Sequence, residues 1–77
     1  MNLGGKKVLV IGLARTGRDC ARFLVDQGAD VLLTDLRSRN ELKQEIEALR
    51  NVALEYRLGG EDPAWVDGVD LVVQLIP

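Results

Sequence analysis

The sequence predicts an α/β protein in which the strands of a parallel sheet alternate with helices. Two short runs, Val8–Ile11 and Val31–Leu33, are apolar at every position, which is typical of strands buried on both faces of a parallel sheet. Between them, from Ala21 to Gly28, apolar or small residues recur at i, i+3, i+4 and i+7, a spacing that places them on one face of a helix. Gly28 is suited to end that helix, because glycine readily adopts the backbone conformation that follows a helix C-terminus.

A second helix and a third strand are predicted next. Ser38 and Glu41 have the S-x-x-E spacing of a capping box, in which each side chain accepts a hydrogen bond from the other residue's backbone N–H. From Leu42 to Leu49 the apolar residues again recur at helical spacing. Apolar and polar residues alternate enough in Val52–Leu58 to predict a strand, which we expect near an edge of the sheet.

The last third of the chain predicts a short helical turn and a fourth strand. Gly59–Gly60 ends the third strand, and Asp62 followed by Pro63 predicts one helical turn, because proline suits the first helical position. Leu71–Val73 is another apolar run. The order is therefore β-α-β-α-β-(short α)-β, and right-handed crossovers lead to the strand order 3-2-1-4. We expect a single Rossmann-like domain over residues 1–77.

Composition and charge exclude several classes of protein. Ten Lys and Arg against twelve Asp and Glu give a formal net charge of −2, unlike the basic domains that bind nucleic acid or the polybasic segments that bind membranes. No run approaches the ~20 apolar residues of a membrane span, and no signal-peptide core is visible. The single cysteine, Cys20, fits a reducing compartment. We expect a cytoplasmic protein with no nucleic-acid and no membrane partner.

The turn from the first strand into the first helix carries the strongest functional signal. It reads G-x-A-x-x-G, with Gly12, Ala14 and Gly17 at the three positions of the dinucleotide fingerprint G-x-G-x-x-G. Such a turn brings backbone N–H groups and the helix N-terminus against a phosphate or diphosphate. Thr16 is placed to donate its hydroxyl to a phosphate oxygen, and Arg15 adds positive charge.

The end of the second strand carries the other half of the signal. Asp35 lies 18 residues after Gly17, where an acidic side chain accepts hydrogen bonds from ribose hydroxyls in nucleotide-binding sheets. Arg37 follows, within reach of a phosphate or a base. Structural roles are the alternative, with Gly12 and Gly17 permitting a tight turn and Asp35 ending a strand. Taken together, the turn and Asp35 favour a nucleotide site.

Other chemistry is missing or has a structural interpretation. The chain has no histidine and no G-x-x-x-x-G-K-[ST] loop, so it lacks the commonest general base and the standard ATP–magnesium cradle. Glu61–Asp62 is a carboxylate pair on a loop, without an apolar pocket to separate the two pKa values. We interpret Cys20 as apolar filler, Trp65 as a packing anchor, and Arg18 and Arg22 as a solvated stripe. We therefore predict no catalytic residue and no metal site.

Six segments form an ordered set along the chain: Lys7–Gly17, Ala21–Leu24, Gly28–Val31, Asp35–Arg37, Leu58–Pro63 and Gly68–Val73. In this order they resemble the N-terminal domain of the UDP-N-acetylmuramoylalanine–D-glutamate ligase family. These enzymes are Mur ligases of bacterial cell-wall synthesis. The resemblance covers essentially the whole chain. Its specificity lies in the ordered set, above all in the Gly-Gly-x-Asp-Pro loop before the fourth strand.

The resemblance implies a function and a set of site residues. Enzymes of this family have a first domain that holds the uridine diphosphate part of UDP-N-acetylmuramoyl-L-alanine, a central domain that binds ATP and Mg²⁺, and a third that receives D-glutamate. The reaction forms an acyl phosphate from the substrate carboxylate, which the glutamate amine then attacks. The implied UDP-binding residues are Gly12, Leu13, Ala14, Arg15, Thr16, Gly17, Asp35, Leu36 and Arg37.

The chain departs from the family pattern at two places. Ala14 stands where the family usually has glycine, and Gln74–Pro77 stands where it tends to have Ser-Pro-Gly. The central and third domains are absent, so we expect a fragment that binds a uridine nucleotide but ligates nothing and holds no cofactor. ATP and Mg²⁺ are expected in the full-length enzyme. We also expect Leu71–Ile76 to be an uncovered apolar edge, through which chains self-associate.

Two other functions stay open on the sequence. One is an NAD(P)-binding Rossmann module of a dehydrogenase or of a ligand-sensing protein, because Asp35 suits the ribose of either kind of ligand. Ala14 counts against a dinucleotide, and the loop Gly59–Pro63 favours the ligase. The other is an interaction module whose glycine turn binds nothing.

Overall fold

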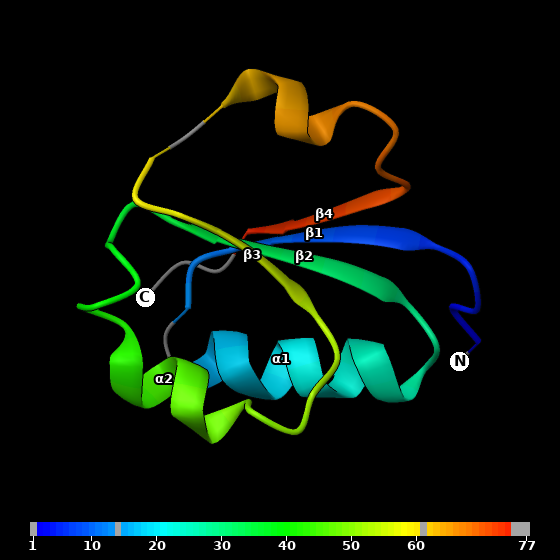
Figure 1. The fold of residues 1–77 in the computed structure, drawn as a ribbon. Helices are drawn as coiled ribbons and strands as arrows, with labels where there is room; N and C mark the ends of the chain where they lie inside the picture. The colour runs from blue at the N-terminus through cyan, green and yellow to red at the C-terminus, as the bar shows by residue number, and fades with distance from the viewer. Residues whose placement is uncertain (1, 14, 61, 75–77) are drawn as a thin grey trace.

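Four parallel strands form the sheet at the centre of the molecule (Figure 1). The computed structural model describes residues 2–13, 15–60 and 62–74. Its strands are β1 (Lys7–Ile11), β2 (Asp30–Asp35), β3 (Glu55–Leu58) and β4 (Leu71–Gln74). They pair in the order β3-β2-β1-β4, with Val10 opposite Leu33 on one side and Val73 on the other. The predicted fold class and strand order are confirmed.

The helices lie on both faces of the sheet, but unequally. Helix α1 (Arg15–Asp26) and helix α2 (Lys43–Ala48) cover one face, and a single 3₁₀ turn, η1 (Pro63–Val66), lies over the other (Figure 1). The reason is topological. The chain steps from β1 outward to β2 and β3, and then crosses back to β4 on the far side of β1. Because each crossover is right-handed, a reversal of direction moves the connection to the opposite face.

The hydrophobic core lies between the sheet and the helices. It is formed by Val8, Val10, Leu13, Ala21, Leu24, Ala29, Val31, Leu33, Leu42 and Leu49, all buried. Leu9 and Ile11 of β1 point to the opposite face of the sheet, where Leu9 is buried beneath η1 and Ile11 is only partly covered. Burying a leucine or valine side chain contributes about 1.5–3 kcal/mol each, and most of this contribution comes from the α1 side.

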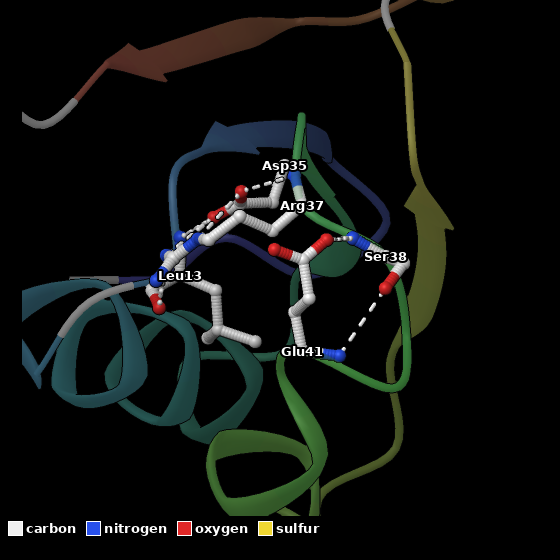
Figure 2. Close-up of polar contacts among 5 residues, drawn as sticks. All are labelled: Leu13, Asp35, Arg37, Ser38 and Glu41. Atoms are coloured by element: carbon white, nitrogen blue, oxygen red, sulfur yellow. Dashed lines mark hydrogen bonds and ion pairs between the residues drawn. The ribbon is translucent and has the colours of Figure 1, made fainter.

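The capping box forms, but it closes a turn that precedes α2. The Ser38 N–H donates to Glu41 Oε1 at 3.0 Å, and the Glu41 N–H donates to Ser38 Oγ at 3.2 Å (Figure 2). The Leu42 N–H then donates to the Ser38 carbonyl at 3.1 Å. Helix α2 begins only at Lys43, four residues later than the start directly after Ser38 that the capping box predicts. The box therefore fixes how the chain leaves β2 and approaches the helix.

The third strand is shorter than the sequence predicts. The Val52 N–H donates to the Leu49 carbonyl at 2.9 Å, so Val52 belongs to the turn that follows α2. Pairing with β2 starts where Glu55 lies opposite Leu32. As expected, β3 is an edge strand.

The face under η1 is loosely filled. Two hollows of about 420 and 440 Å³ lie between the sheet and the η1 segment, and the Trp65 side chain lines both. Trp65 is half-buried, as expected of a packing anchor. In the part of the chain that the structure describes, no helix has the length and apolar character needed to cross a membrane.

Candidate functional site

A crevice of about 250 Å³ opens at the carboxyl ends of the strands. Its lining residues are Ile11, Gly12, Thr34, Asp35, Leu36, Gly60 and Gln74. They come from the ends of β1, β2 and β4 and from the segment after β3. Strand β1 lies between β2 and β4, so the connections on its two sides run in opposite directions. Such a switch point is where open parallel sheets bind their ligands.

Gly12 shapes the turn that leaves β1. Its φ of 103° lies in the region that favours glycine, and its N–H donates to the Thr34 carbonyl at 2.8 Å. The turn therefore stays attached to the end of β2. The next side chain, that of the predicted site residue Leu13, is fully buried in the core, and Leu13 does not line the crevice.

Asp35 ties the turn to the segment after β2. Its carboxylate accepts from the Leu13 N–H at 2.9 Å (Oδ2) and from the Arg37 N–H at 2.9 Å (Oδ1). The Arg37 guanidinium adds two bonds, Nε to Oδ1 at 3.0 Å and Nη2 to Oδ2 at 2.8 Å. Nη2 also donates to the Leu13 carbonyl at 3.1 Å. Figure 2 shows Arg37 folded back over Asp35 toward Leu13. We call these three residues the Asp35 cluster.

Electrostatics hold the Asp35 cluster in its charged state. The side-chain hydrogen bonds from Arg37, aided by the Arg37 and Leu13 N–H groups and opposed by burial, lower the pKa of Asp35 to about 2. The same bond raises the pKa of Arg37, and the charges of Glu45 and Glu41 raise it further. The Asp35 side chain is only 8% exposed whereas that of Arg37 is 47% exposed, so the cation is the accessible partner.

The first turn of α1 is the other accessible part of the predicted site. Arg15 and Thr16 are exposed, and Gly17 is buried. The first turn of the helix carries no acidic residue, which leaves the positive end of the helix dipole uncancelled. Ala14 lies outside the residues that the structure describes.

Several residues of the crevice were not predicted. Thr34 is a polar residue only 5% exposed, Gln74 lies opposite Ile11 at the end of β4, and Gly60 follows β3. The predicted topology held the signal that could have found them. In a parallel sheet all carboxyl ends meet at one edge, so the residue that ends each predicted strand was a candidate.

Other reactive groups contribute little here. Among residues 2–13, 15–60 and 62–74 no group of three or more His, Cys, Asp or Glu side chains is placed to hold a metal ion. Cys20 is half-buried and packs against the core, and burial raises the pKa of its thiol. Its interpretation as apolar filler fits this position.

The sheet, its switch point and the glycine turn together define a Rossmann-like α/β domain. A sequence profile described as "Mur ligase MurD-like, N-terminal domain" matches residues 6–75. The chain therefore belongs to this Mur ligase family, as an N-terminal domain of the MurD-like type.

Curated relatives agree with this assignment. The chain is 39% identical over 72 residues to a protein of Bdellovibrio bacteriovorus, 42% over 73 residues to one of Geotalea daltonii, and 43% over 75 residues to one of Alkaliphilus metalliredigens. Each of these relatives is named UDP-N-acetylmuramoylalanine–D-glutamate ligase. The matches cover 94–95% of this chain but 16% of each relative, so the chain spans about one sixth of their length.

Proposed function

We propose that this chain binds the uridine diphosphate part of UDP-N-acetylmuramoyl-L-alanine for a D-glutamate-adding Mur ligase. One observation carries the proposal. The crevice at the switch point contains Gly12, Asp35 and Leu36 of the implied site, in a chain 39–43% identical to enzymes named for this substrate. The alternative of an NAD(P)-binding module gains no observation of its own.

The size of the crevice favours the nucleoside as its occupant. Its 250 Å³ is below the ~300–1,000 Å³ of pockets that enclose a whole ligand of drug size. A uracil and its ribose fit this space better than a complete nucleotide sugar does. Leu36, which is 67% exposed at the rim, offers an apolar surface to the base.

The charges favour one orientation of the ligand. Arg37 is neighboured by the carboxylates of Asp35, Glu41 and Glu45, all of which raise its pKa. This acidic neighbourhood opposes a diphosphate. The start of α1 suits it better, since Arg15 is exposed there and no acidic residue occupies the first turn. The nucleoside then lies toward Arg37 and the diphosphate toward α1.

The remainder of the reaction is proposed to lie elsewhere. We assign residues 1–77 to one nucleotide-binding domain with no catalytic residue, and we place the ATP and Mg²⁺ of the ligation in other parts of the longer full-length enzyme. A cytoplasmic location goes with this role, and the single cysteine is consistent with a reducing compartment.

An NMR titration tests the nucleotide site. Labelled protein is titrated with UDP and separately with NAD, and backbone amide shifts are followed. We expect saturating shifts with UDP at Gly12, Thr16, Leu36 and Arg37, with a dissociation constant on the order of millimolar (~4 kcal/mol) for a single open face, and none with NAD.

Arg15→Ala provides the matched variant, and Arg57→Ala is its control. Both arginines are exposed, but Arg57 lies on β3 beside the hollow under η1. Arg15→Ala should weaken UDP binding several-fold, while Arg57→Ala should leave it unchanged. Saturating shifts with NAD alone would favour the dehydrogenase-type module, and silence with both nucleotides would reject the site.

We further propose that the chain self-associates through β4. Both outer strands of the sheet are edges, but β3 carries the charged and exposed Glu55 and Arg57, a device that discourages pairing between sheets. Strand β4 lacks charged residues, and its Leu71 and Val72 are each 45% exposed. The last two residues of the expected edge, Leu75 and Ile76, lie outside the described residues.

Light scattering across a concentration series tests this association. Wild type should gain mass as the concentration rises. Val72→Lys places a charge on the edge strand and should keep the protein monomeric. The control variant Val66→Lys, at a residue 48% exposed on η1, should associate as the wild type does. A wild type that stays monomeric at high concentration would refute the proposal.

A further inference from the structure

A hollow of about 440 Å³ lies beneath η1, on the face of the sheet opposite α1 and α2 (Figure 1). Its lining residues are Leu9, Ile11, Thr34, Asp62, Pro63, Trp65 and Val66. We call this space the apolar hollow. It neighbours the crevice, with which it shares Ile11 and Thr34. Its volume is within the range of about 300–1,000 Å³ in which pockets bind small molecules.

The apolar hollow has an aliphatic floor and an aromatic wall. Leu9, which is 2% exposed, and Ile11 come from β1. Pro63, Trp65 and Val66 come from η1 and face these two residues across the hollow. An apolar ligand gains free energy by leaving water for such a surface. The indole adds a preference for cations, which it attracts more strongly than other aromatic side chains do.

The charged side chain that lines the apolar hollow is a carboxylate. Asp62 caps η1, and its Oδ1 accepts from the Ala64 N–H at 2.9 Å. Within the described part of the chain, Oδ2 accepts no hydrogen bond and Asp62 forms no ion pair. The described lining of the hollow contains no lysine or arginine. Its charge is therefore negative, and one carboxylate oxygen is left for a ligand.

The second hollow under η1 differs in its charges. Its volume is about 420 Å³, and Lys7 and Arg57 line it together with three acidic residues, Asp30, Glu55 and Asp67. Arg57 pairs with Glu55 at 3.4 Å. Because charges of both signs line this space, they compensate one another and favour neither sign of ligand. The combination of an apolar surface, an indole and an unpaired carboxylate belongs to the apolar hollow.

We propose that the apolar hollow binds a small organic cation, in which an ammonium group is carried on an aromatic or branched aliphatic body. The ammonium lies beside Asp62, and the apolar body lies against Trp65 and Leu9. This site is separate from the proposed nucleotide site and does not depend on it. A neutral analogue keeps the apolar contacts but loses the attraction of the carboxylate, and an anionic analogue is repelled by it.

Three probes of similar size test the charge preference. Benzylammonium, benzyl alcohol and benzoate carry the same ring with a positive, a neutral and a negative substituent. Trp65 is the single tryptophan, so its fluorescence reports on the hollow directly. We expect saturable binding of benzylammonium with a dissociation constant on the order of millimolar. Benzyl alcohol should bind about fivefold more weakly, because it lacks the ion pair and the cation–π contact, and benzoate should bind most weakly.

Amide shifts measured by NMR locate the bound probe. Benzylammonium should shift the amides of Trp65 and Val66, which belong to the hollow, and leave those of Gly12 and Leu36, which belong to the crevice. Shifts centred on Gly12 and Leu36 would place the cation in the crevice and overturn the proposal.

Asp62→Asn is the matched variant, and Asp67→Asn is its control. Asparagine caps a helix about as well as aspartate does, so Asp62→Asn removes the charge while keeping the cap. Benzylammonium and benzyl alcohol should then bind within about twofold of each other. Asp67→Asn makes the same change of net charge at a residue of the other hollow and should retain the fivefold preference.

The wild-type series is sufficient to refute the proposal even where a variant does not fold. Equal affinity for benzylammonium and benzyl alcohol, or no saturable binding of benzylammonium, would overturn it. A preference that survives Asp62→Asn would do the same. Failure of the nucleotide site gives a different result, because a protein that shows no shift with UDP would still bind benzylammonium at Trp65.

Discussion

Gly28 connects the end of α1 to the N-terminal segment, and its replacement by alanine has a calculable cost. The Gly28 N–H donates to the Val25 carbonyl at 2.9 Å, and the Ala29 N–H donates to the Leu24 carbonyl at 3.1 Å. This turn requires φ of +89° at Gly28. A Cβ built there would lie 3.2 Å from the Cα and 3.4 Å from the N of Gly4, so Gly28→Ala meets two penalties.

Two other glycines separate these penalties. Gly59 has φ of +84° with nothing within 4 Å of a Cβ, and Gly60 has neither the positive φ nor a neighbour within 4 Å. An alanine in the left-handed region costs about 1–2 kcal/mol, so Gly59→Ala should lose that amount. Gly60→Ala should change stability little or gain up to about 1 kcal/mol, because it restricts the unfolded chain. Gly28→Ala should lose about 2–3 kcal/mol, since a backbone neighbour must also move.

Urea unfolding of the four proteins measures the series, with the single tryptophan, Trp65, as the fluorescent probe and circular dichroism beside it. A 77-residue domain has only a few kcal/mol to lose, so the order should be unmistakable. Equal losses of unfolding free energy for Gly28→Ala and Gly59→Ala would mean that the contact of the added Cβ with the Gly4 backbone costs nothing. Equal stability of all three variants would refute the argument from φ as well.

Three further predictions concern stability. The pKa of Asp35 is lowered from 3.8 to about 2, so the ionised carboxylate stabilises the folded protein by at most about 2 kcal/mol. This stabilisation is complete above pH ~4 and is lost as the pH falls through 2. The difference in unfolding free energy between wild type and Asp35→Asn should therefore shrink over that range, and a constant difference from pH 6 to pH 2 would contradict this. Ser38→Ala removes one bond of the capping box and should cost about 1 kcal/mol, measured by thermal unfolding against Asn40→Ala, a neighbouring exposed position. Asp70→Ala removes the acceptor of the Lys7 N–H, at 2.8 Å, and should cost about 1 kcal/mol, while Asp67→Ala in the preceding exposed turn should stay within about 0.5 kcal/mol.

The sheet was predictable because local and global signals agreed. The all-apolar runs at Val8–Ile11 and Val31–Leu33 become the two central neighbours, β1 and β2, and such runs are typical of strands covered on both faces. The weaker alternation in Val52–Leu58 becomes an edge strand. The predicted bounds of α2 and β3 were wrong by up to four residues, because apolar periodicity does not reveal the local turn bonds of Leu42 and Val52.

The site was predictable in position but not in detail. The sequence placed Gly12, Asp35 and Arg37 at neighbouring strand ends, and the structure brings them together. That Leu13 turns its side chain into the core depends on the path of a turn only a few residues long. The bonds within the Asp35 cluster likewise depend on one arginine rotamer, which no spacing in the sequence fixes.

The unequal covering of the two faces gives the molecule a weak half. Under η1 the sheet meets hollows instead of packed side chains, and the start of β4 is fastened to β1 by the paired bonds of Lys7 and Asp70. Stability is not uniform in such a fold, and sparsely packed segments open before the whole molecule does. The amides of Trp65 and Asp67, bonded only within η1, should exchange with deuterium at a lower free energy than those of β1.

This opening would reach the crevice. Gly12 and Asp35 belong to the well-packed half of the molecule, but Gln74, at the end of β4, is one of the crevice walls. When β4 detaches from β1 the crevice loses that wall while β1, β2 and α1 are still folded. Ligand affinity should therefore disappear at a lower denaturant concentration than helical structure does. Conversely, a nucleotide that binds across the crevice joins the two halves and protects the weaker one from exchange.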